Sequence, residues 1–260
     1  MKKPPLNPDR LKGKVAIVTG TGAGIGKGVA LLLARQGAKV VGCDIHADWA
    51  EATVTEARAE GLDFSSLHPC DLMTEAGAQS LIDQAVALHG GLDILVNAAA
   101  VGIFGWIEDL SYQDWRRTMV GELDIVFLAC KAAWPHLIRR GGGSIINFAS
   151  ANARQALAVS GALAHCAGKG GVLAMTRQLA MEGGPHGIRA NTISPALIVT
   201  AATAAVVENP DFEAEVMRKL MIKRLGQPED AGWLASFLAS DEASWITGAD
   251  YALDGGATAW

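Results

Sequence analysis

The sequence predicts an α/β domain in which a parallel sheet carries helices on both faces. Short apolar runs alternate with longer segments of helical periodicity along almost the whole chain. A glycine-rich turn, Thr19–Gly26, joins the first apolar run to the first helical segment. The 260 residues are 50% hydrophobic and 19% charged, which is enough apolar material for a sizeable core. Seven expected strands fit one doubly wound domain over residues 1–260, with residues 1–10 as a flexible N-terminal segment.

The first strand is expected at Lys14–Thr19, a run rich in β-branched residues that ends at the glycine-rich turn. Gly24–Arg35 follows as a helix, because Val29, Leu32 and Leu33 recur on one side of it. Later strands are expected wherever a short run of mainly apolar residues lies between two helical segments. These runs are Ala38–Cys43, Ser65–Cys70, Asp93–Asn97, Ser144–Ala149, Ile188–Ser194 and Asp250–Leu253.

Helical periodicity fills the intervals between these strands. The expected helices are Asp48–Glu60, Glu75–Leu88, Tyr112–Ile138, Leu163–Met181 and Glu229–Ser240. A further helical segment, Thr200–Leu220, has no strand before it. It belongs to an insertion, residues 200–227, that is longer than an ordinary crossover and carries several apolar side chains. Such insertions commonly cover binding sites, so we expect a substrate lid here.

Composition excludes several classes of function. Lys plus Arg number 22 and Asp plus Glu number 27, so the formal charge is 22 − 27 = −5, and no basic stripe indicates a nucleic-acid partner. Apolar stretches are interrupted before about 18 residues, which argues against a membrane span. No apolar segment of a secretory signal follows the N-terminal lysines. We therefore expect a cytoplasmic protein with four reduced, structural cysteines: Cys43, Cys70, Cys130 and Cys166.

The turn Thr19–Gly26 (TGTGAGIG) has the composition and context of a phosphate-binding turn. Its glycines let backbone N–H groups approach a pyrophosphate, and the following helix directs its positive end to the same place. Asp44 ends the second strand, 20 residues after Gly24. A carboxylate there accepts hydrogen bonds from a ribose 2′-hydroxyl and repels a 2′-phosphate, which favours NAD over NADP.

With these motifs the chain resembles the short-chain dehydrogenase/reductase family from Leu11 to Ala257. TGTGAGIG matches the family's TGxxxGxG turn, and further matches follow along the chain. They are Cys70-Asp71-Leu72, Asn97-Ala98-Ala99-Ala100 (in place of NNAG), Arg189-Ala190-Asn191 with Ser194-Pro195-Ala196, then Ile198 and Thr200, Leu225–Asp230, and Asp254-Gly255-Gly256.

The resemblance implies a Rossmann-type fold and an NAD-dependent oxidoreductase acting on a secondary alcohol or ketone. It implies a cofactor site made by Thr19, Gly20, Gly24, Ile25, Gly26, Asp44, Asp71, Leu72, Asn97, Lys169, Pro195, Ile198 and Thr200. Within that set, Asp71 and Asn97 would line the adenosine side. Ile198 and Thr200 would hold the carboxamide. The family is usually dimeric or tetrameric through its two long helices, so a homo-oligomer is implied here by analogy.

The catalytic positions depart from the family pattern. The family's YxxxK motif places a tyrosine acid/base four residues before a lysine, and here the matching residues are His165 and Lys169. The family's serine falls on Ser150, at the end of a strand, or on Asn152, which has the usual spacing of thirteen residues from position 165. Ser150 is favoured, Asn152 is the next candidate, and Ser160 is a third and less favoured one. The family's asparagine on the first long helix falls on Glu122.

A histidine at position 165 changes the acid–base chemistry. Free tyrosine has a pKa near 10 and free histidine one near 6.5, so neutral imidazole is a competent base at pH 7 and a poor acid. We therefore expect His165 to favour alcohol oxidation, with Glu122 able to stabilise its imidazolium form. Two alternatives stay open: an NAD-binding pseudoenzyme or inactivated variant, and a non-redox lyase or isomerase that uses His165 and Glu122. The histidines show no metal-ligand spacing, so no metal is expected.

Overall fold

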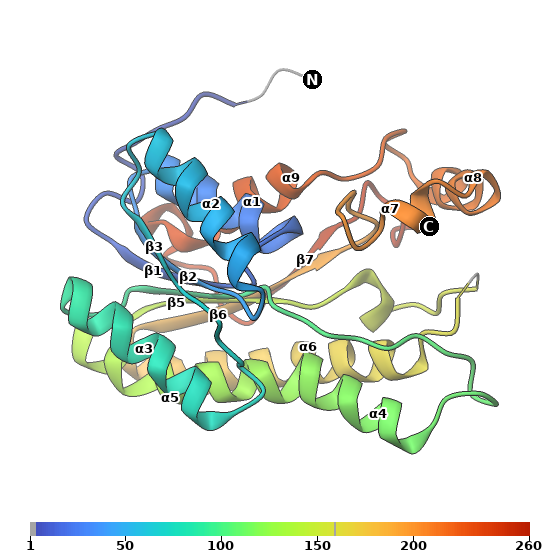
Figure 1. Cartoon of the computed structure of the whole chain (residues 1–260), viewed down its shortest axis with the longest axis horizontal. Coiled ribbons are helices and arrows are strands. Elements are labelled where there is room, and N and C mark those ends of the chain that lie inside the picture. The colour runs from blue at the N-terminus through green and yellow to red at the C-terminus, as the bar shows by residue number, and fades with distance from the viewer. Residues whose placement is uncertain (1–3, 159) are drawn as a thin grey trace.

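Seven parallel strands form one sheet in the computed structural model, which describes residues 4–158 and 160–260 (Figure 1). The strand order is β3-β2-β1-β4-β5-β6-β7, and all six neighbouring pairs are parallel. Their bounds are β1 Val15–Thr19, β2 Lys39–Cys43, β3 Phe64–Leu67, β4 Ile94–Asn97, β5 Gly143–Phe148, β6 Ile188–Pro195 and β7 Asp250–Leu253. The predicted single doubly wound α/β domain is confirmed.

Helices cover both faces of the sheet. In Figure 1, α1, α2 and α9 lie above it and α3, α5 and α6 lie below it. The bounds are α1 Gly24–Arg35, α2 Ala47–Ala59, α3 Glu75–His89, α4 Tyr112–Met119, α5 Ile125–Arg140, α6 Leu163–Gly183 and α9 Pro228–Ala239. Successive strand residues belong to opposite cores, so that Val18 packs on the α1 and α9 side while Ile17 packs on the other. Burial on both faces is the reason the strands appear as continuous apolar runs.

The third strand ends at Leu67, three residues earlier than Ser65–Cys70 predicted. Pro69 lacks a backbone N–H and cannot continue the ladder with β2. The chain returns to β2 at Cys70, whose N–H donates to the Asp44 carbonyl over 2.9 Å.

The expected uninterrupted helix Tyr112–Ile138 is divided by a π-helical turn, η1, at Val120–Asp124, and α5 then runs on to Arg140. The loop after β4 approaches the helix at this turn. The Val101 N–H donates to the Gly121 carbonyl over 2.9 Å, and a Cβ at Gly121 would lie 2.4 Å from the Val101 carbonyl oxygen. The π turn therefore lies where a loop binds the helix backbone, and it carries Glu122.

The insertion at 200–227 contains two short helices, α7 (Ala204–Val207) and α8 (Pro210–Lys219), where one helix, Thr200–Leu220, was expected. Proline has no N–H and fits only the first helical turn, so a new helix begins at Pro210. Both ends of the insertion are held: the Val199 N–H donates to the Gly226 carbonyl, and the Ile222 N–H donates to the Gly255 carbonyl.

Residues 1–3 of the N-terminal segment lie outside the described part of the chain. The segment is attached to the domain by Arg10, which pairs with Glu242 over 3.2 Å, and by Leu11, which is fully buried. Within the described residues, none of the helices has both the length and the apolarity to cross a membrane.

Candidate active site

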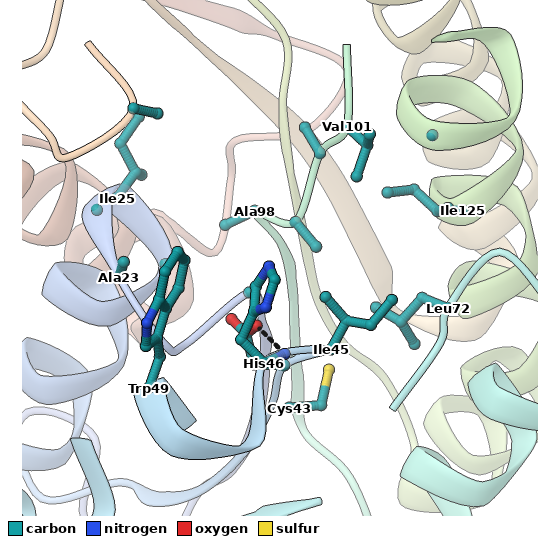
Figure 2. Close-up of a pocket in the computed structure, with 18 of the residues that line it drawn as sticks. Ala23, Ile25, Cys43, Ile45, His46, Trp49, Leu72, Ala98, Val101 and Ile125 are labelled. Atoms are coloured by element: carbon teal, nitrogen blue, oxygen red, sulfur yellow. Dashed lines mark hydrogen bonds between the residues drawn. The ribbon is translucent and has the colours of Figure 1, made fainter. Parts of the chain in front are cut away.

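A cleft of about 480 Å³ opens at the carboxyl ends of the strands, beside the turn between β1 and α1 (Figure 2). This edge of a doubly wound sheet is where ligands bind, because the strand order reverses beside β1. The lining includes the expected residues Gly20, Gly24, Ile25, Gly26, Asp44, Leu72 and Thr200.

The glycines of the turn are required by close packing. Gly20 has φ +72°, and a Cβ there would lie 2.9 Å from Ala99 Cα. A Cβ on Gly26 would lie 2.1 Å from the Gly20 carbonyl oxygen. Only a residue without a side chain lets α1 begin this close to β1, so its N-terminal N–H groups are presented to the cleft.

Asp44 is held at the rim of the cleft by two backbone groups. Its carboxylate accepts the Gly22 N–H over 2.8 Å and the His46 N–H over 2.9 Å. Figure 2 shows His46 and Trp49 on the wall of the cleft, and their ring centroids are 4.3 Å apart. Neither aromatic residue was singled out for the cofactor site from the sequence, although both follow the second strand immediately.

Other expected cofactor residues lie outside the cleft lining. Thr19 is buried, and its hydroxyl accepts the N–H groups of Ala98 and Ala99, which joins β1 to the chain after β4. Asn97 is also buried, and its amide donates to the Asn147 side chain over 2.8 Å. Asp71 is exposed and accepts the Met73 N–H.

The chain after β6 passes close to the phosphate turn. Pro195 ends β6, and Ile198 is buried and forms a bridge with Gly226. Thr200 enters the cleft lining, and its methyl carbon would be 3.2 Å from a Cβ on Gly24. The residues expected at the nicotinamide end are thus brought beside the glycine-rich turn.

Three side chains from separate elements form a continuous line of hydrogen bonds. Ser150 Oγ, at the end of β5, is 3.2 Å from Nε2 of His165 in the first turn of α6. Nδ1 of His165 is 2.7 Å from Oε1 of Glu122 in the π turn. An ionised carboxylate can only accept, so in a neutral imidazole the proton of this short bond lies on Nδ1 and the Nε2 lone pair faces Ser150.

The Glu122 carboxylate occupies space left by two glycines. A Cβ on Gly102 would lie 2.6 Å from Oε1, and one on Gly168 would lie 3.0 Å from Oε2. The side chain is 3% exposed, and Oε2 has no hydrogen-bond partner among the described residues. A buried carboxylate whose principal partner is one imidazole therefore contacts His165 in a poorly screened environment.

Lys169 lies one helical turn after His165 and is buried. Its Nζ donates to the Phe148 carbonyl over 3.1 Å. Burial lowers the pKa of Lys169 from its ordinary value, and the negative charge of Glu122 acts in the opposite direction. The hydrogen bond thus holds the ammonium at the last residue of β5, Phe148, which precedes Ser150 by two residues.

Ser150 and Asn152 occupy different places in this site. Ser150 carries the hydroxyl that faces His165, whereas Asn152 contributes its backbone N–H, which donates to Ser150 Oγ over 3.1 Å. Arg154, two residues further along, is paired with the Asp250 carboxylate.

Phe104, in the loop after β4, is a further residue of the site that the sequence motifs do not indicate. Its ring centroid lies 5.2 Å from that of His165. The loop is held there because the Gly105 N–H donates to the Gly161 carbonyl over 2.8 Å and the Ile103 N–H donates to Thr118. No periodic pattern marks such a loop contact.

Neither tyrosine of the chain stands in for position 165. Tyr112 begins α4 and is 78% exposed, and Tyr251 lies in β7 opposite Ile193. Within residues 4–158 and 160–260, no cluster of three or more His, Cys, Asp or Glu side chains is arranged to hold a metal.

Comparison with known proteins gives consistent relatives over the whole chain. The family model described as enoyl-(acyl carrier protein) reductase matches residues 20–258. D-threitol dehydrogenase of Mycolicibacterium smegmatis is 39% identical, over 96% of this chain and 94% of that protein. Cyclohexanol dehydrogenase of an Acinetobacter species is 35% identical, over 96% of this chain and 97% of that protein.

Among solved structures, a 7α-hydroxysteroid dehydrogenase complexed with NADH and 7-oxo glycochenodeoxycholic acid superposes with a TM-score of 0.90. It is 35% identical, and the match covers 95% of each chain. Matches of this extent, together with the seven-stranded parallel sheet, show that the chain belongs to the short-chain dehydrogenase/reductase family of oxidoreductases.

Proposed function

We propose that the protein interconverts a secondary alcohol and a ketone with NAD(H), and that His165 is its proton-transferring residue. The observation that carries this proposal is the hydrogen-bonded line from Ser150 through His165 to Glu122, with Lys169 one turn further along α6. This geometry supports a base role, because the Nε2 atom of a neutral His165 lies beside a hydroxyl that can orient a substrate oxygen. The alcohol and diol dehydrogenases among the relatives support the same reaction class.

The cleft residues fit a nicotinamide dinucleotide. Gly20, Gly24 and Gly26 line the cleft, and the close packing that their lack of side chains permits would let the turn present N–H groups to a pyrophosphate. The Asp44 carboxylate at the rim suits a ribose hydroxyl and repels a phosphate, which supports NAD(H) over NADP(H). Thr200 would hold the carboxamide. When bound, the cofactor supplies the hydride acceptor or donor.

The chain's own residues then manage the proton. Ser150 Oγ and His165 Nε2 would both bind the alcohol oxygen, and the Nε2 lone pair would take its proton as hydride leaves. The imidazolium so formed faces the Glu122 carboxylate, which offsets its charge. The buried Lys169 ammonium would bind the nicotinamide ribose and stabilise negative charge on the substrate oxygen.

The proposed lid and the loop at Phe104 shape the substrate side. The insertion at 200–227 is fixed at Val199 and Ile222, so α7 and α8 between these points are the part that can close. The Phe104 ring offers an apolar contact beside His165. These contacts favour a substrate with an apolar face next to the reacting carbon.

The test is to measure NADH formation from secondary alcohols by its absorbance, using the parent protein and His165→Ala. His186→Ala, at an exposed histidine in the short 3-10 helix Gly184–His186, is the matched control. We expect His165→Ala to lose about 100-fold or more in kcat/KM while NADH still binds. Full activity of His165→Ala would exclude the base role. Binding of NAD without turnover of any alcohol by the parent would point to a pseudoenzyme, and turnover without change in NADH to a lyase or isomerase.

The proposal includes a homo-oligomer, a dimer or tetramer, that uses the helices α5 and α6. Phe127 on α5 is 50% exposed and Met181 on α6 is 63% exposed, so both present apolar surface. Light scattering of the parent and of Phe127→Glu measures the molar mass. A monomeric parent at micromolar concentration would contradict this assembly.

A further inference from the structure

The hydrogen-bonded line Ser150–His165–Glu122 can also support a reaction that needs no cofactor. Ser150 Oγ accepts the Asn152 N–H over 3.1 Å, so its own proton is free to donate to His165 Nε2, 3.2 Å away. His165 in turn donates Nδ1–H to Glu122 over 2.7 Å. When the imidazole is neutral, the hydroxyl can therefore donate to a base whose tautomer is set by a buried carboxylate.

This order of groups is the one that activates a serine for acyl transfer: nucleophile, base, and acid that orients the base. We propose that the protein also hydrolyses short-chain carboxylic esters, with Ser150 as nucleophile, His165 as general base and Glu122 as the residue that orients and stabilises His165.

The arrangement is built into the fold at several points. The carboxylate fits only because Gly102 and Gly168 lack side chains, since a Cβ on either would lie 3.0 Å or less from a Glu122 oxygen. The π turn brings Glu122 to this place on the helix. The side chains of Glu122 and His165 are 3% and 14% exposed, so water screens their interaction weakly.

The surroundings indicate an uncharged ester with a small acyl group. Phe104 packs beside His165 and offers an apolar wall to the acyl chain. Two nearby cations are already engaged: Lys169 Nζ binds the Phe148 carbonyl and Arg154 pairs with Asp250. The charge of Arg154 is neutralised by Asp250, and the Lys169 ammonium is buried behind the end of β5, so the surroundings favour an uncharged substrate.

The competing nucleophile is Cys166, which follows His165 directly. Burial raises the pKa of its thiol, so the reactive thiolate is scarce at neutral pH. The hydroxyl of Ser150, by contrast, needs no ionisation in advance because His165 removes its proton during attack. Acylation is therefore expected on Ser150.

The reaction balances without oxidant or cofactor. Ser150 Oγ attacks the ester carbonyl carbon and its proton passes to His165 Nε2, while the carbonyl oxygen takes the negative charge. Two residues after Ser150, the Asn152 side-chain amide would be the hydrogen-bond donor to that oxygen. The carbon–oxygen bond to the alcohol then breaks, and the alcohol leaves with the proton from His165.

Water completes the cycle. It attacks the acyl-serine, His165 takes its proton, and the proton returns to Ser150 Oγ as the carboxylic acid leaves. The net reaction is ester plus water giving acid plus alcohol.

The experiment uses p-nitrophenyl acetate, without added nicotinamide cofactor, and follows release of nitrophenolate. The variants are Ser150→Ala, His165→Ala and Glu122→Gln. Matched controls are Ser160→Ala, a serine in the loop before α6, and His186→Ala. We expect the first two variants to fall by about 100-fold or more toward the background rate, and Glu122→Gln by about 10- to 100-fold. The controls should keep the parent rate.

A second measurement on the parent protein does not depend on folding of any variant. Rapid acid quenching followed by peptide mass spectrometry locates the acetyl group, which should be on the peptide that contains Ser150. Acetyl on Cys166 or on surface lysines alone, or a parent rate equal to that of Ser150→Ala, would overturn the proposal. Because the assay contains no NAD, its outcome is separate from that of the dehydrogenase.

Discussion

Replacing Glu122 with glutamine tests the central electrostatic argument with little change of shape. The variant keeps the size of the side chain between Gly102 and Gly168, and it keeps an oxygen that can accept the His165 Nδ1–H. It removes one negative charge 2.7 Å from the imidazole. The variant should therefore lose only the electrostatic stabilisation of the imidazolium, which forms when His165 takes a proton during the reaction.

The magnitude follows from the burial of the pair. A charge-assisted hydrogen bond contributes about 1.5–3 kcal/mol, against about 1 kcal/mol for a neutral one. Two unit charges 4 Å apart in a medium of effective dielectric 20 interact by about 4 kcal/mol, which sets the upper bound. Because glutamine keeps the neutral hydrogen bond, the expected loss is the difference of about 0.5–2 kcal/mol in the transition state, or about 2- to 30-fold in kcat/KM for alcohol oxidation.

The assay is steady-state NADH formation, with kcat and KM measured separately. The matched control is Glu182→Gln, which removes an exposed carboxylate from α6. NADH affinity and the thermal midpoint should differ little from those of the parent. A Glu122→Gln variant with the kcat/KM of the parent would refute the argument that Glu122 stabilises the imidazolium.

Three further predictions address the cofactor, the lid and the stability of the fold. Lys169→Met should abolish turnover yet raise the free energy of unfolding of the cofactor-free protein by about 1–3 kcal/mol, because it removes a buried ammonium. Burial lowers the pKa of Lys169, so the folded state binds fewer protons than the unfolded state. The destabilisation by the buried ammonium is therefore complete below that lowered pKa, and it disappears as the pH rises toward the unfolded pKa near 10.4. A stability gain of Lys169→Met that grows with pH in chemical denaturation would contradict this. Asp44→Ser should weaken NADH binding about tenfold and relieve repulsion of NADPH, which isothermal titration with both cofactors measures; unchanged preference would remove Asp44 as the selector. Deleting Trp260 removes the hydrogen bond, 3.0 Å long, from its indole N–H to the carbonyl of Lys219 at the end of α8. The substrate KM should rise by up to about tenfold, with kcat and the melting temperature nearly unchanged. An unchanged KM would show that this contact does not contribute to lid closure.

Much of the fold was predictable because its signals are local. Strands buried on both faces must be apolar throughout, so β1, β4 and β5 stand out as runs in the sequence. Strand ends shifted by one to three residues, since hydrogen bonding rather than hydrophobicity ends a strand. Pro69 ended β3 and Pro210 divided the insertion, and both effects follow from a missing N–H.

The candidate site was predictable in part. The glycine turn and Asp44 line the cleft as expected. Asn97 and Asp71, in contrast, make hydrogen bonds outside the lining, because their side chains are turned to other partners. His46 and Trp49 were missed because one residue on a helix face looks the same whether or not a cavity lies beside it.

The sequence by itself determined the family of fold, the phosphate-binding turn and the presence of His165 and Lys169 four residues apart. The tertiary structure decided what His165 can do. Glu122 reaches it across 43 positions of sequence, through a π turn and the space beside two glycines, and Ser150 reaches it across 15. Helical periodicity describes contacts within a turn or two, so it cannot place a carboxylate from one helix against an imidazole on another. Only packing of the two long helices and β5 brings the three groups into one line.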